Sequence, residues 1–341
     1  MRILYGVQAT GNGHITRARI MARALADVDA QVDWVFSGRP REALFDMDIF
    51  GNFQSFRGLT FAIRSGRVHY GKTLLSCNFR QLYRDIQSLD LTDYDLIIND
   101  FEPVSAWAAR RAGKKVIGLS HQNAFQHRIP KAGSNPFVSS FMRWFAPADQ
   151  PIGLHWHHFG QPILPPLVEP SHYPNQPRAR HYLVYLPFSE PKDILPQLRS
   201  FSDYHFSVYL PVSEPSEEGH IHLRPFSREG FQRDLHQCEG VICSSGFELP
   251  SEAIQLGRKL LVQPVAGQME QLSNALALTQ LGYGHATRTL GKSAIGEWLP
   301  LPRPQPVHYP NVAKAIAEWL KNTGGENIQP LQESLWRGFP D

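Results

Sequence analysis

Short apolar runs alternate with segments of helical periodicity along this chain, and that alternation is the strongest constraint on its fold. In the first 160 residues the apolar runs are Ile3–Val7, Val32–Phe36, Asp95–Ile98 and Val116–Leu119, with helical patterns at 15–26 and 104–112 between them. An intervening helix returns the chain to the same end of the sheet, so successive strands pair in parallel. The pattern predicts an α/β domain whose parallel sheet has helices on both faces.

The alternation stops at a proline-rich segment, Gly160–Pro166, and then starts again. Proline stiffens a connector and cannot enter a central strand, so the segment is typical of a domain boundary. Further apolar runs follow at 181–186, 205–210, 240–243 and 259–262, with helical patterns near 231–236, 249–256, 269–281 and 311–322. We therefore expect two doubly wound, Rossmann-like domains, residues 1–162 and 163–322. The tail, residues 323–341, carries Trp336 and is expected to pack back on the first domain.

Composition narrows the class of protein. Of the 341 residues 42% are hydrophobic and 19% are charged, and 34 Lys and Arg against 31 Asp and Glu leave a net charge of only +3. These values favour a soluble globular protein and do not favour nucleic acid as a partner. Three scattered cysteines, without a signal peptide or an apolar stretch long enough to span a membrane, predict a cytoplasmic location. Any contact with the inner face of the cell membrane is expected to be peripheral.

A glycine turn follows the first apolar run and leads into a helix. It reads Gly11-Asn12-Gly13-His14. Glycines let the backbone approach a ligand, and a helix start offers free N–H groups to an anion. A nicotinamide or flavin cofactor is not expected, because Thr16 stands at the third glycine of that fingerprint and no ribose-binding acid follows the second strand.

His14 and Asp100 are predicted to lie at the same edge of the first sheet, because each follows the end of a parallel strand. An imidazole oriented by a carboxylate can take a proton from a hydroxyl group. Two simpler interpretations stay open. His14 can be a surface residue at a helix start, and Asp100 can cap the helix that follows it.

The second polar stretch, Cys243–Gly257, begins as a buried strand and passes through Ser244, Ser245 and Gly246 into a helix. Hydroxyl groups and a glycine at a helix amino end suit a phosphate. Glu252 lies six residues after Gly246, where a carboxylate can accept hydrogen bonds from a ribose diol. The simpler interpretation is a serine-capped helix with Glu252 in its solvated first turn.

The spacing of this region resembles the donor-site signature of the UDP-dependent glycosyltransferases of GT-B fold. Glu252 follows Gly246 by six residues, Gly257 follows after five and Pro264 after seven, and Glu270-Gln271-Leu272-Ser273-Asn274-Ala275 completes the pattern. It is similar both to the plant and antibiotic enzymes and to the bacterial N-acetylglucosaminyltransferase of peptidoglycan synthesis. Overall, the chain looks closest to glycosyltransferase-like proteins of bacteria and archaea. The resemblance implies an acceptor-binding first domain that faces a nucleotide-sugar-binding second domain across a cleft.

The resemblance also assigns roles to residues of this chain. It makes His14, with Asp100, the catalytic pair. At the donor site, Ser244, Ser245 and Gly246 would bind the diphosphate and Glu252 would bind the ribose. Glu270 and Gln271 would bind the sugar, and the strip around Phe226 would contact the base. Glu248 would lie beside these residues. The acceptor side would include Gly11, Asn12, Gly13, His121 and Gln122. Ser244 and Glu248 depart from the plant signature, which has His and Asn there, and this weakens the assignment of the base and the sugar.

The resulting hypothesis is an inverting, metal-independent hexosyltransferase that moves a sugar from a nucleotide diphosphate sugar, with UDP favoured, to an acceptor hydroxyl. No cofactor is expected beyond the nucleotide sugar itself as co-substrate. The acceptor is not identified; a lipid-linked molecule and a saccharide are both considered. Two alternatives are a GT-B epimerase or hydrolase of sugar nucleotides, and a non-catalytic protein that binds nucleotide sugars.

Three further features have weaker interpretations. The histidines of His155-Trp156-His157-His158 can bind a metal, but packing beside the linker is favoured because no acid or cysteine cluster accompanies them. The basic loop 57–72 can face an anionic acceptor or only solvent. The apolar segment 135–145 can lie on a membrane surface, although a core or interdomain helix is favoured.

Overall fold

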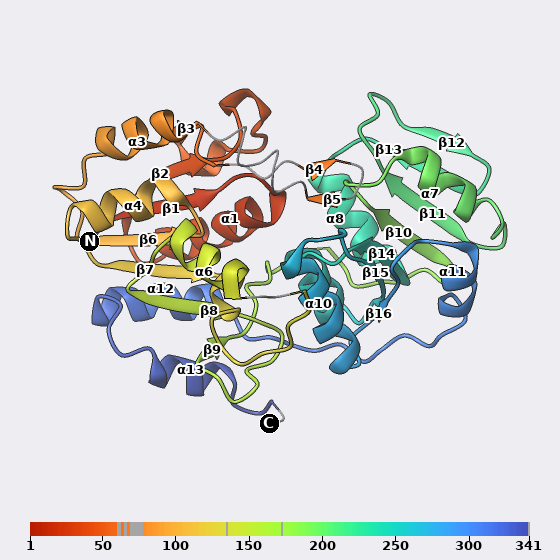
Figure 1. The fold of residues 1–341 in the computed structure, drawn as a ribbon. Helices are drawn as coiled ribbons and strands as arrows, with labels where there is room; N and C mark the ends of the chain where they lie inside the picture. Colours follow the sequence, from red (N-terminus) through yellow and green to blue (C-terminus); the bar gives the residue numbers. More distant parts are fainter. Residues whose placement is uncertain (60–62, 65–66, 69–77, 134–135, 172, 340–341) are drawn as a thin grey trace.

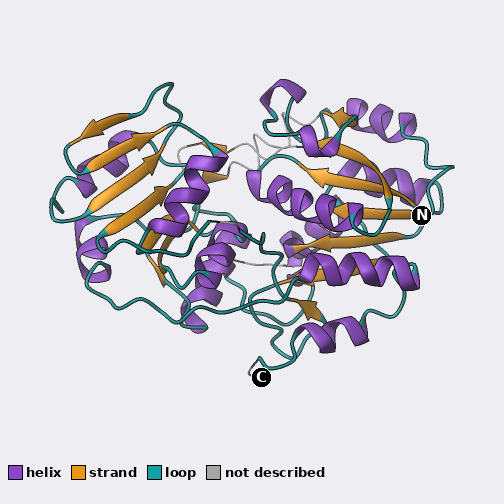
Figure 2. Cartoon of the chain, turned by 180° about the vertical axis from the view of Figure 1, so that it is seen from behind, coloured by secondary structure: helices purple, strands orange, loops and turns teal. Residues whose placement is uncertain are grey.

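The computed structural model describes residues 1–59, 63–64, 67–68, 78–133, 136–171 and 173–339. Its main feature is a pair of seven-stranded sheets, one in each half of the chain, which lie side by side (Figure 1). Helices cover the strands of both halves, as the view from behind also shows (Figure 2). The predicted α/β class is confirmed.

The first sheet has the strand order β3-β2-β1-β6-β7-β8-β9, and every neighbouring pair is parallel. Its strands are β1 (Arg2–Gln8), β2 (Gln31–Ser37), β3 (Phe53–Phe56), β6 (Leu96–Asp100), β7 (Val116–Ser120), β8 (Gln150–Leu154) and β9 (Ile163–Leu164). The helices of this half are α1 (Asn12–Ala26), α3 (Phe79–Ser88), α4 (Pro103–Arg111), α5 (His121–Ala124) and α6 (Pro136–Phe145). Two 3-10 turns, Arg41–Ala43 and Asp48–Phe50, and a small hairpin of β4 (Ile63–Arg64) and β5 (Arg67–Val68) complete it.

The second sheet has the order β12-β13-β11-β10-β14-β15-β16, parallel except for the edge pair β12 and β13. Its strands are β10 (His181–Tyr185), β11 (His205–Tyr209), β12 (Ser216–Glu218), β13 (Ile221–Arg224), β14 (Gly240–Ser244), β15 (Lys259–Gln263) and β16 (His285–Ala286). The helices after the boundary are α7 (Pro191–Leu198), α8 (Arg228–Gln237), α9 (Glu248–Gln255), α10 (Met269–Gln280), α11 (Lys292–Trp298), α12 (Val312–Thr323) and α13 (Gln329–Leu335).

Different helices bury the two faces of the first sheet. Apolar residues of α1 and α12 share one core with side chains such as Tyr5 and Trp34. Residues of α3, α4 and α6, among them Leu82, Val104 and Phe145, form a separate core on the other face. Each strand therefore has apolar side chains on both sides, which is why its sequence is an almost continuous apolar run.

The chain crosses between the halves twice. Strand β9 pairs with β8 in the first sheet, although the predicted second domain begins at residue 163. Helix α12, predicted in the second domain, packs on α1 in the first half. Trp336 is buried beyond it, and its indole Nε1 donates to the carbonyl of Ile163 at 2.6 Å. The apolar stripe of α12 thus returns the chain to the first half before the tail begins.

Trp156 joins the halves at their centre. Its side chain is fully buried, and its indole Nε1 donates to the Ser251 hydroxyl of α9 at 2.8 Å. Its ring also packs against Phe247, with centroids 5.1 Å apart. Among the described residues, no helix is both long and apolar enough to cross a bilayer.

Candidate active site

A cavity of about 490 Å³ lies where the carboxyl ends of the two parallel sheets face each other. Open α/β sheets bind ligands at this edge. Its walls come from both halves: His14, Arg17 and Gln122 from the first, and Gly246, Glu252 and Glu270 from the second.

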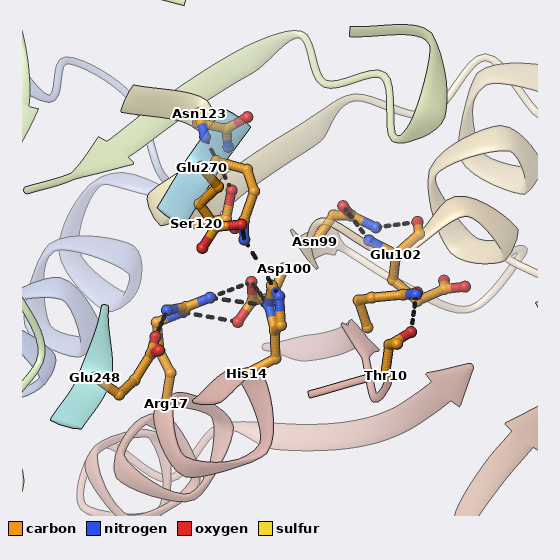
Figure 3. Close-up of polar contacts among 12 residues, drawn as sticks. Thr10, His14, Arg17, Asn99, Asp100, Glu102, Ser120, Asn123, Glu248 and Glu270 are labelled. Carbon is orange, nitrogen blue, oxygen red and sulfur yellow. Dashed lines mark hydrogen bonds and ion pairs between the residues drawn. The ribbon is translucent and has the colours of Figure 1, made fainter. Parts of the chain in front are cut away.

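His14 and Asp100 are brought together at one wall of this cavity. Their contact is 2.8 Å between His14 Nδ1 and Asp100 Oδ1 (Figure 3). Because a carboxylate oxygen only accepts, Nδ1 donates to Asp100. Arg17 Nη2 lies 2.9 Å from the same ring nitrogen. Nε2 lies 3.4 Å from Gln122 Nε2. In a neutral imidazole, donation from Nδ1 to Asp100 leaves Nε2 as the acceptor that a general base needs.

Arg17 binds the same carboxylate. Its Nε donates to Asp100 Oδ2 at 2.8 Å and its Nη2 donates to Oδ1 at 2.7 Å, a bidentate pair. Burial alone raises the pKa of Asp100, but the Arg17 guanidinium and His14 outweigh it and hold that pKa below its usual range. Asp100 is thus an anion although its side chain is fully buried.

The backbone turns sharply after Asp100, the last residue of β6. Phe101 has φ of 56°, a left-handed conformation that is costly for a bulky residue. Phe101 separates two carboxylates, that of Asp100 before it and that of Glu102 after it. The Glu102 side chain accepts from the backbone N–H of Val104 and Ser105 at 2.7 and 2.6 Å and caps α4. Glu102, and not Asp100, is therefore the helix cap.

Glu248 of α9 reaches across the cavity and forms an ion pair with Arg17. Its carboxylate lies against Gly13 in the first turn of α1, where a Cβ atom would overlap it. Gly13 thus permits the close approach of the two halves at this point. Arg17 is the residue that binds both carboxylates, one from each half.

The amino end of α9 presents Ser244 and Gly246 to the cavity, and the space beside Gly246 is open. This fits the expected anion site. Ser245 does not fit its expected role, because it is fully buried and its hydroxyl donates to the carbonyl of Gln271 at 2.8 Å. Its side chain holds the turn before α9 against α10 instead of facing a diphosphate.

Two carboxylates of the second half line the cavity as expected. Glu252 accepts from Gln232 Nε2 at 2.6 Å, and burial, with Glu169 and Glu248 nearby, raises its pKa to about 7. Burial also raises the pKa of Glu270, which accepts from Gln122 Nε2 at 3.0 Å. Gln122 therefore contacts both His14 and the region expected to hold a sugar.

Gln271 and His121 have structural contacts that the sequence does not reveal. Gln271 is buried, and its Oε1 accepts from the backbone N–H of Val265 at 2.9 Å. His121 is fully buried, donates from Nδ1 to the carbonyl of Leu154 at 2.8 Å, and stacks on Phe247 with centroids 3.9 Å apart. Burial lowers the pKa of His121 to about 4, so it is neutral at pH 7. Both belong to the lining of the cavity, but their side-chain contacts mainly fix its walls.

The remaining expected residues lie at the cavity mouth. Gly11 precedes α1, and Asn12 accepts from Arg39 Nη1 at 3.1 Å and faces the Tyr185 hydroxyl at 3.5 Å. Phe226 is 52% exposed, with its ring 6.1 Å from that of Tyr185. An exposed aromatic ring at a ligand cavity offers a stacking surface.

Arg17 is the functional residue that sequence reasoning missed. Its signal was present, because His14 and Arg17 are three residues apart in a helix and so share a face. The helical pattern at 15–26 contains Arg17 but not His14, whereas α1 begins at Asn12, so the predicted bounds do not place the two residues in one helix. Arg39 and Gln232 were missed too, and no local pattern marks them.

The histidines beside the linker are used for packing. His155 is fully buried, its pKa is well below the usual value because of burial, and its ring lies edge-on to Trp156. His157 and His158 stack on each other and pack near Trp336. Within the described ranges, no group of three His, Cys, Asp or Glu side chains is arranged to hold a metal ion. Most of the basic loop 57–72 lies outside the described residues.

Comparison with known proteins identifies the family and the fold. The sequence profile described as glycosyl transferase family 1 matches residues 1–137 and 158–302. No protein with a curated function matches the sequence.

Three solved structures have similar folds at low sequence identity. The glycosyltransferase SnogD from Streptomyces nogalater is 16% identical with a TM-score of 0.55, covering 88% of this chain and 91% of its own. SsfS6 from Streptomyces sp. SF2575, complexed with thymidine diphosphate, is 14% identical with a TM-score of 0.56, covering 84% and 87%. LpCGTa in complex with UDP is 17% identical with a TM-score of 0.58, covering 98% of each chain. The predicted GT-B fold is thereby confirmed.

Proposed function

This chain belongs to glycosyl transferase family 1 and is a glycosyltransferase of GT-B fold, and from that premise we propose that it transfers a sugar from a nucleotide diphosphate sugar to an acceptor hydroxyl with inversion and without a metal. The observation that carries the proposal is the His14–Asp100 pair, which lies across a cavity from the amino end of α9.

His14 is the proposed general base. Its Nε2 accepts the proton of the acceptor hydroxyl, and the oxygen then attacks the anomeric carbon of the donor. Asp100 stabilises the imidazolium that forms and stays ionised because Arg17 holds its proton affinity low. Attack from the side of His14, with the diphosphate held in the opposite half, inverts the anomeric carbon.

The diphosphate is proposed to bind at the amino end of α9. Gly246 and the first free N–H groups of the helix meet the negative charge that develops as the sugar leaves. Ser244 adds a hydroxyl group at the cavity wall. These donors supply the stabilisation that a divalent cation supplies in other transferases, which is why the proposed reaction needs no metal.

The nucleoside is proposed to lie between α9 and the strip around Phe226. Glu252, at the cavity wall, accepts from the ribose hydroxyls, and the exposed ring of Phe226 stacks on the base. Two structures of similar fold are complexes with a nucleotide, SsfS6 with thymidine diphosphate and LpCGTa with UDP. A pyrimidine donor is accordingly proposed, with UDP ahead of dTDP on the donor-site spacing.

Gln122 and Glu270 are proposed to orient the sugar. Gln122 lies within 3.4 Å of the base nitrogen of His14 and donates to Glu270 at 3.0 Å. Both side chains can exchange these contacts for sugar hydroxyls, which would place the anomeric carbon next to His14.

Calorimetric titration with UDP, dTDP and GDP tests the donor site, because it needs no knowledge of the acceptor. UDP is expected to bind, His14→Ala is expected to keep that affinity, and Glu252→Gln is expected to weaken it. Binding is expected to be the same with EDTA present. Failure of all three nucleotides to bind the folded protein at millimolar concentration would rule the site out.

Nuclear magnetic resonance of UDP-sugars incubated with the enzyme distinguishes the reaction type. A transferase leaves the donor intact, apart from slow hydrolysis, until an acceptor is added, and the product then has the opposite anomeric coupling. An epimerised donor without any acceptor would contradict transfer, and retained anomeric configuration would contradict His14 as the base of a single displacement.

A further inference from the structure

The outer sides of α3, α4 and α6 carry aromatic and arginine side chains that the fold itself does not bury. Phe79, Tyr83 and Trp144 are 45%, 60% and 43% exposed. Exposed large aromatic residues cost solubility unless a partner covers them. The core under these helices is already complete, because inward residues such as Leu82 and Phe145 fill it.

The same surface is strongly cationic. Five arginines are exposed on it, and none forms an ion pair with a carboxylate in the part of the chain that the structure describes. They are Arg80 and Arg84 on α3, Arg110 and Arg111 on α4, and Arg143 on α6. The three helices contain one acidic residue, Asp85, and it is buried. For a chain with a net charge of only +3, this is a local concentration of charge.

These residues form one surface. The Trp107 ring lies 5.9 Å from that of Trp144, and its indole Nε1 donates to the Trp144 carbonyl at 3.1 Å. Arg110 lies over the Trp107 ring, 5.5 Å from its centroid, and α3 packs on α4. Figure 1 shows α3, α4 and α6 on the same side of the first sheet. We call this surface the aromatic–arginine face.

We propose that the aromatic–arginine face docks on the surface of an anionic lipid membrane. Aromatic side chains insert favourably at the level of lipid headgroups, and arginines nearby bind anionic headgroups. A single-stranded nucleic acid also binds aromatic and cationic groups. Lipid is favoured because α6 connects this face to the cavity, so that an apolar acceptor in the membrane would have a route to the site. Helix α6 exposes Arg143 and Trp144 on this face, while its Phe141 and Met142 line the cavity.

The docking site is independent of the proposed reaction, since it concerns a surface and not the cavity. It nevertheless has a consequence for the enzyme: an apolar acceptor lying in the bilayer surface could enter the cavity along α6. The proposed contact depends on charge, because exposed arginines supply part of it.

Co-sedimentation of the full chain with vesicles tests the proposal. The chain is expected to bind vesicles that contain phosphatidylglycerol and not vesicles of phosphatidylcholine alone, and 0.5 M salt is expected to release it. Each arginine near an anionic surface strengthens binding about fivefold. Arg80→Glu with Arg84→Glu should therefore weaken binding more than about tenfold, and Phe79→Ser with Tyr83→Ser should also weaken it.

The matched control is Lys314→Glu with Lys321→Glu on α12, at the opposite face of the first sheet. It changes the net charge by the same amount and should alter vesicle binding by less than about twofold. Thermal unfolding verifies that each variant folds. No binding of the wild type to anionic vesicles, an equal loss in the control, or tighter binding to single-stranded oligonucleotide than to vesicles would each overturn the proposal. None of these readouts depends on nucleotide binding or sugar transfer.

Discussion

Arg17 and Asp100 are joined by two parallel hydrogen bonds inside the protein, and the same guanidinium reaches across the cavity to Glu248. The Arg17 side chain is 2% exposed and that of Asp100 is fully buried. Both bonds to Asp100 are charge-assisted. The guanidinium therefore fixes the carboxylate that orients His14, and it links that carboxylate to the first turn of α9 in the other half.

Arg17→Met should be strongly destabilising. It leaves the buried Asp100 carboxylate without its guanidinium partner, and removing one partner of a buried pair costs about 3–5 kcal/mol. Arg17→Lys keeps the charge but cannot form both parallel bonds, so its cost should be smaller. Urea denaturation measures both values. Arg23→Met, which removes an exposed partner of Glu169, is the control and should cost about 1 kcal/mol or less.

Replacing the proposed base should affect turnover and not donor binding. His14→Ala is expected to lower kcat by about 10²–10⁴, the usual contribution of a general base, while the Kd for UDP changes little. Steady-state kinetics and calorimetry measure the two quantities. His285→Ala removes an exposed imidazole of β16 and should change neither. A His14→Ala enzyme with normal kcat would show that another group takes the proton.

His121 should act on stability and not on the acceptor. In the folded chain its pKa is about 4, against an ordinary value of 6.5, so the folded state binds fewer protons between these values. Its contribution is therefore complete above pH 6.5 and is lost as the pH falls toward 4. Two and a half pKa units correspond to about 3 kcal/mol.

His121→Phe keeps the stacking on Phe247 but leaves the carbonyl of Leu154 without its donor. The variant should be about 1–3 kcal/mol less stable at pH 7, and its stability should fall less steeply between pH 6.5 and 4. Urea denaturation at several pH values measures both effects. A changed acceptor KM with unchanged stability would restore the role that the family resemblance gives to His121.

The sequence predicts the central strands well and the edge strands poorly. Runs such as Ile3–Val7 and Lys259–Val262 are buried on both faces, so their apolar character is continuous. The edge strands β9 and β16 have only two residues each, which is too short to show a strand-like hydrophobic pattern. Their positions depend on neighbours distant in the chain, such as β8 for β9.

The residues of the candidate site also fall into some that the sequence predicts and others that it does not. His14, Asp100 and Gly246 were predictable because each follows a parallel strand, and topology alone brings strand ends to one edge. The contacts of Ser245 and Gln271 were not, since each is satisfied by a group 26 or 6 residues away that local spacing does not reveal. A polar residue at a strand end is thus placed by the fold, but whether it faces ligand or backbone depends on packing.

Glu252 should make stability depend on pH in the opposite sense from His121. Its pKa is about 7 in the folded chain against an ordinary 4.5, so the folded state binds more protons between these values. Its contribution to stability is complete below pH 4.5 and is lost as the pH rises through 7. Glu252→Gln should therefore raise the unfolding free energy by about 1–3 kcal/mol at pH 8 and hardly change it at pH 4.5.

Thermal and urea denaturation of Glu252→Gln at the two pH values measure this difference. The exposed carboxylate of Glu318, whose neighbour is Lys314, is replaced by Gln as the control and should give similarly small stability changes at both pH values. An equal gain for Glu252→Gln at pH 4.5 and 8 would mean that the carboxyl group does not titrate near neutrality. The same variant, tested with UDP, reports separately on the ribose contact.

Gly13→Ala should separate the two halves locally without unfolding α1. Alanine is the better helix former by about 1 kcal/mol, so the helix itself would gain. The new Cβ, however, overlaps the Glu248 carboxylate, which is the mobile end of a flexible side chain and can move away only by breaking its pair with Arg17. We expect a net loss of about 1–2 kcal/mol of stability together with weaker coupling between the halves.

A double-mutant cycle with Glu248→Ala isolates this effect. Once the Glu248 carboxylate has been removed, Gly13→Ala no longer has a clash to relieve and should be neutral or stabilising, so the two changes should be non-additive by more than 0.5 kcal/mol. Gly11→Ala is the matched control, because nothing lies within 4 Å of its added Cβ. Strict additivity of Gly13→Ala and Glu248→Ala would mean that the two residues do not touch in solution, and the link from α9 through Arg17 to Asp100 would then be absent as well.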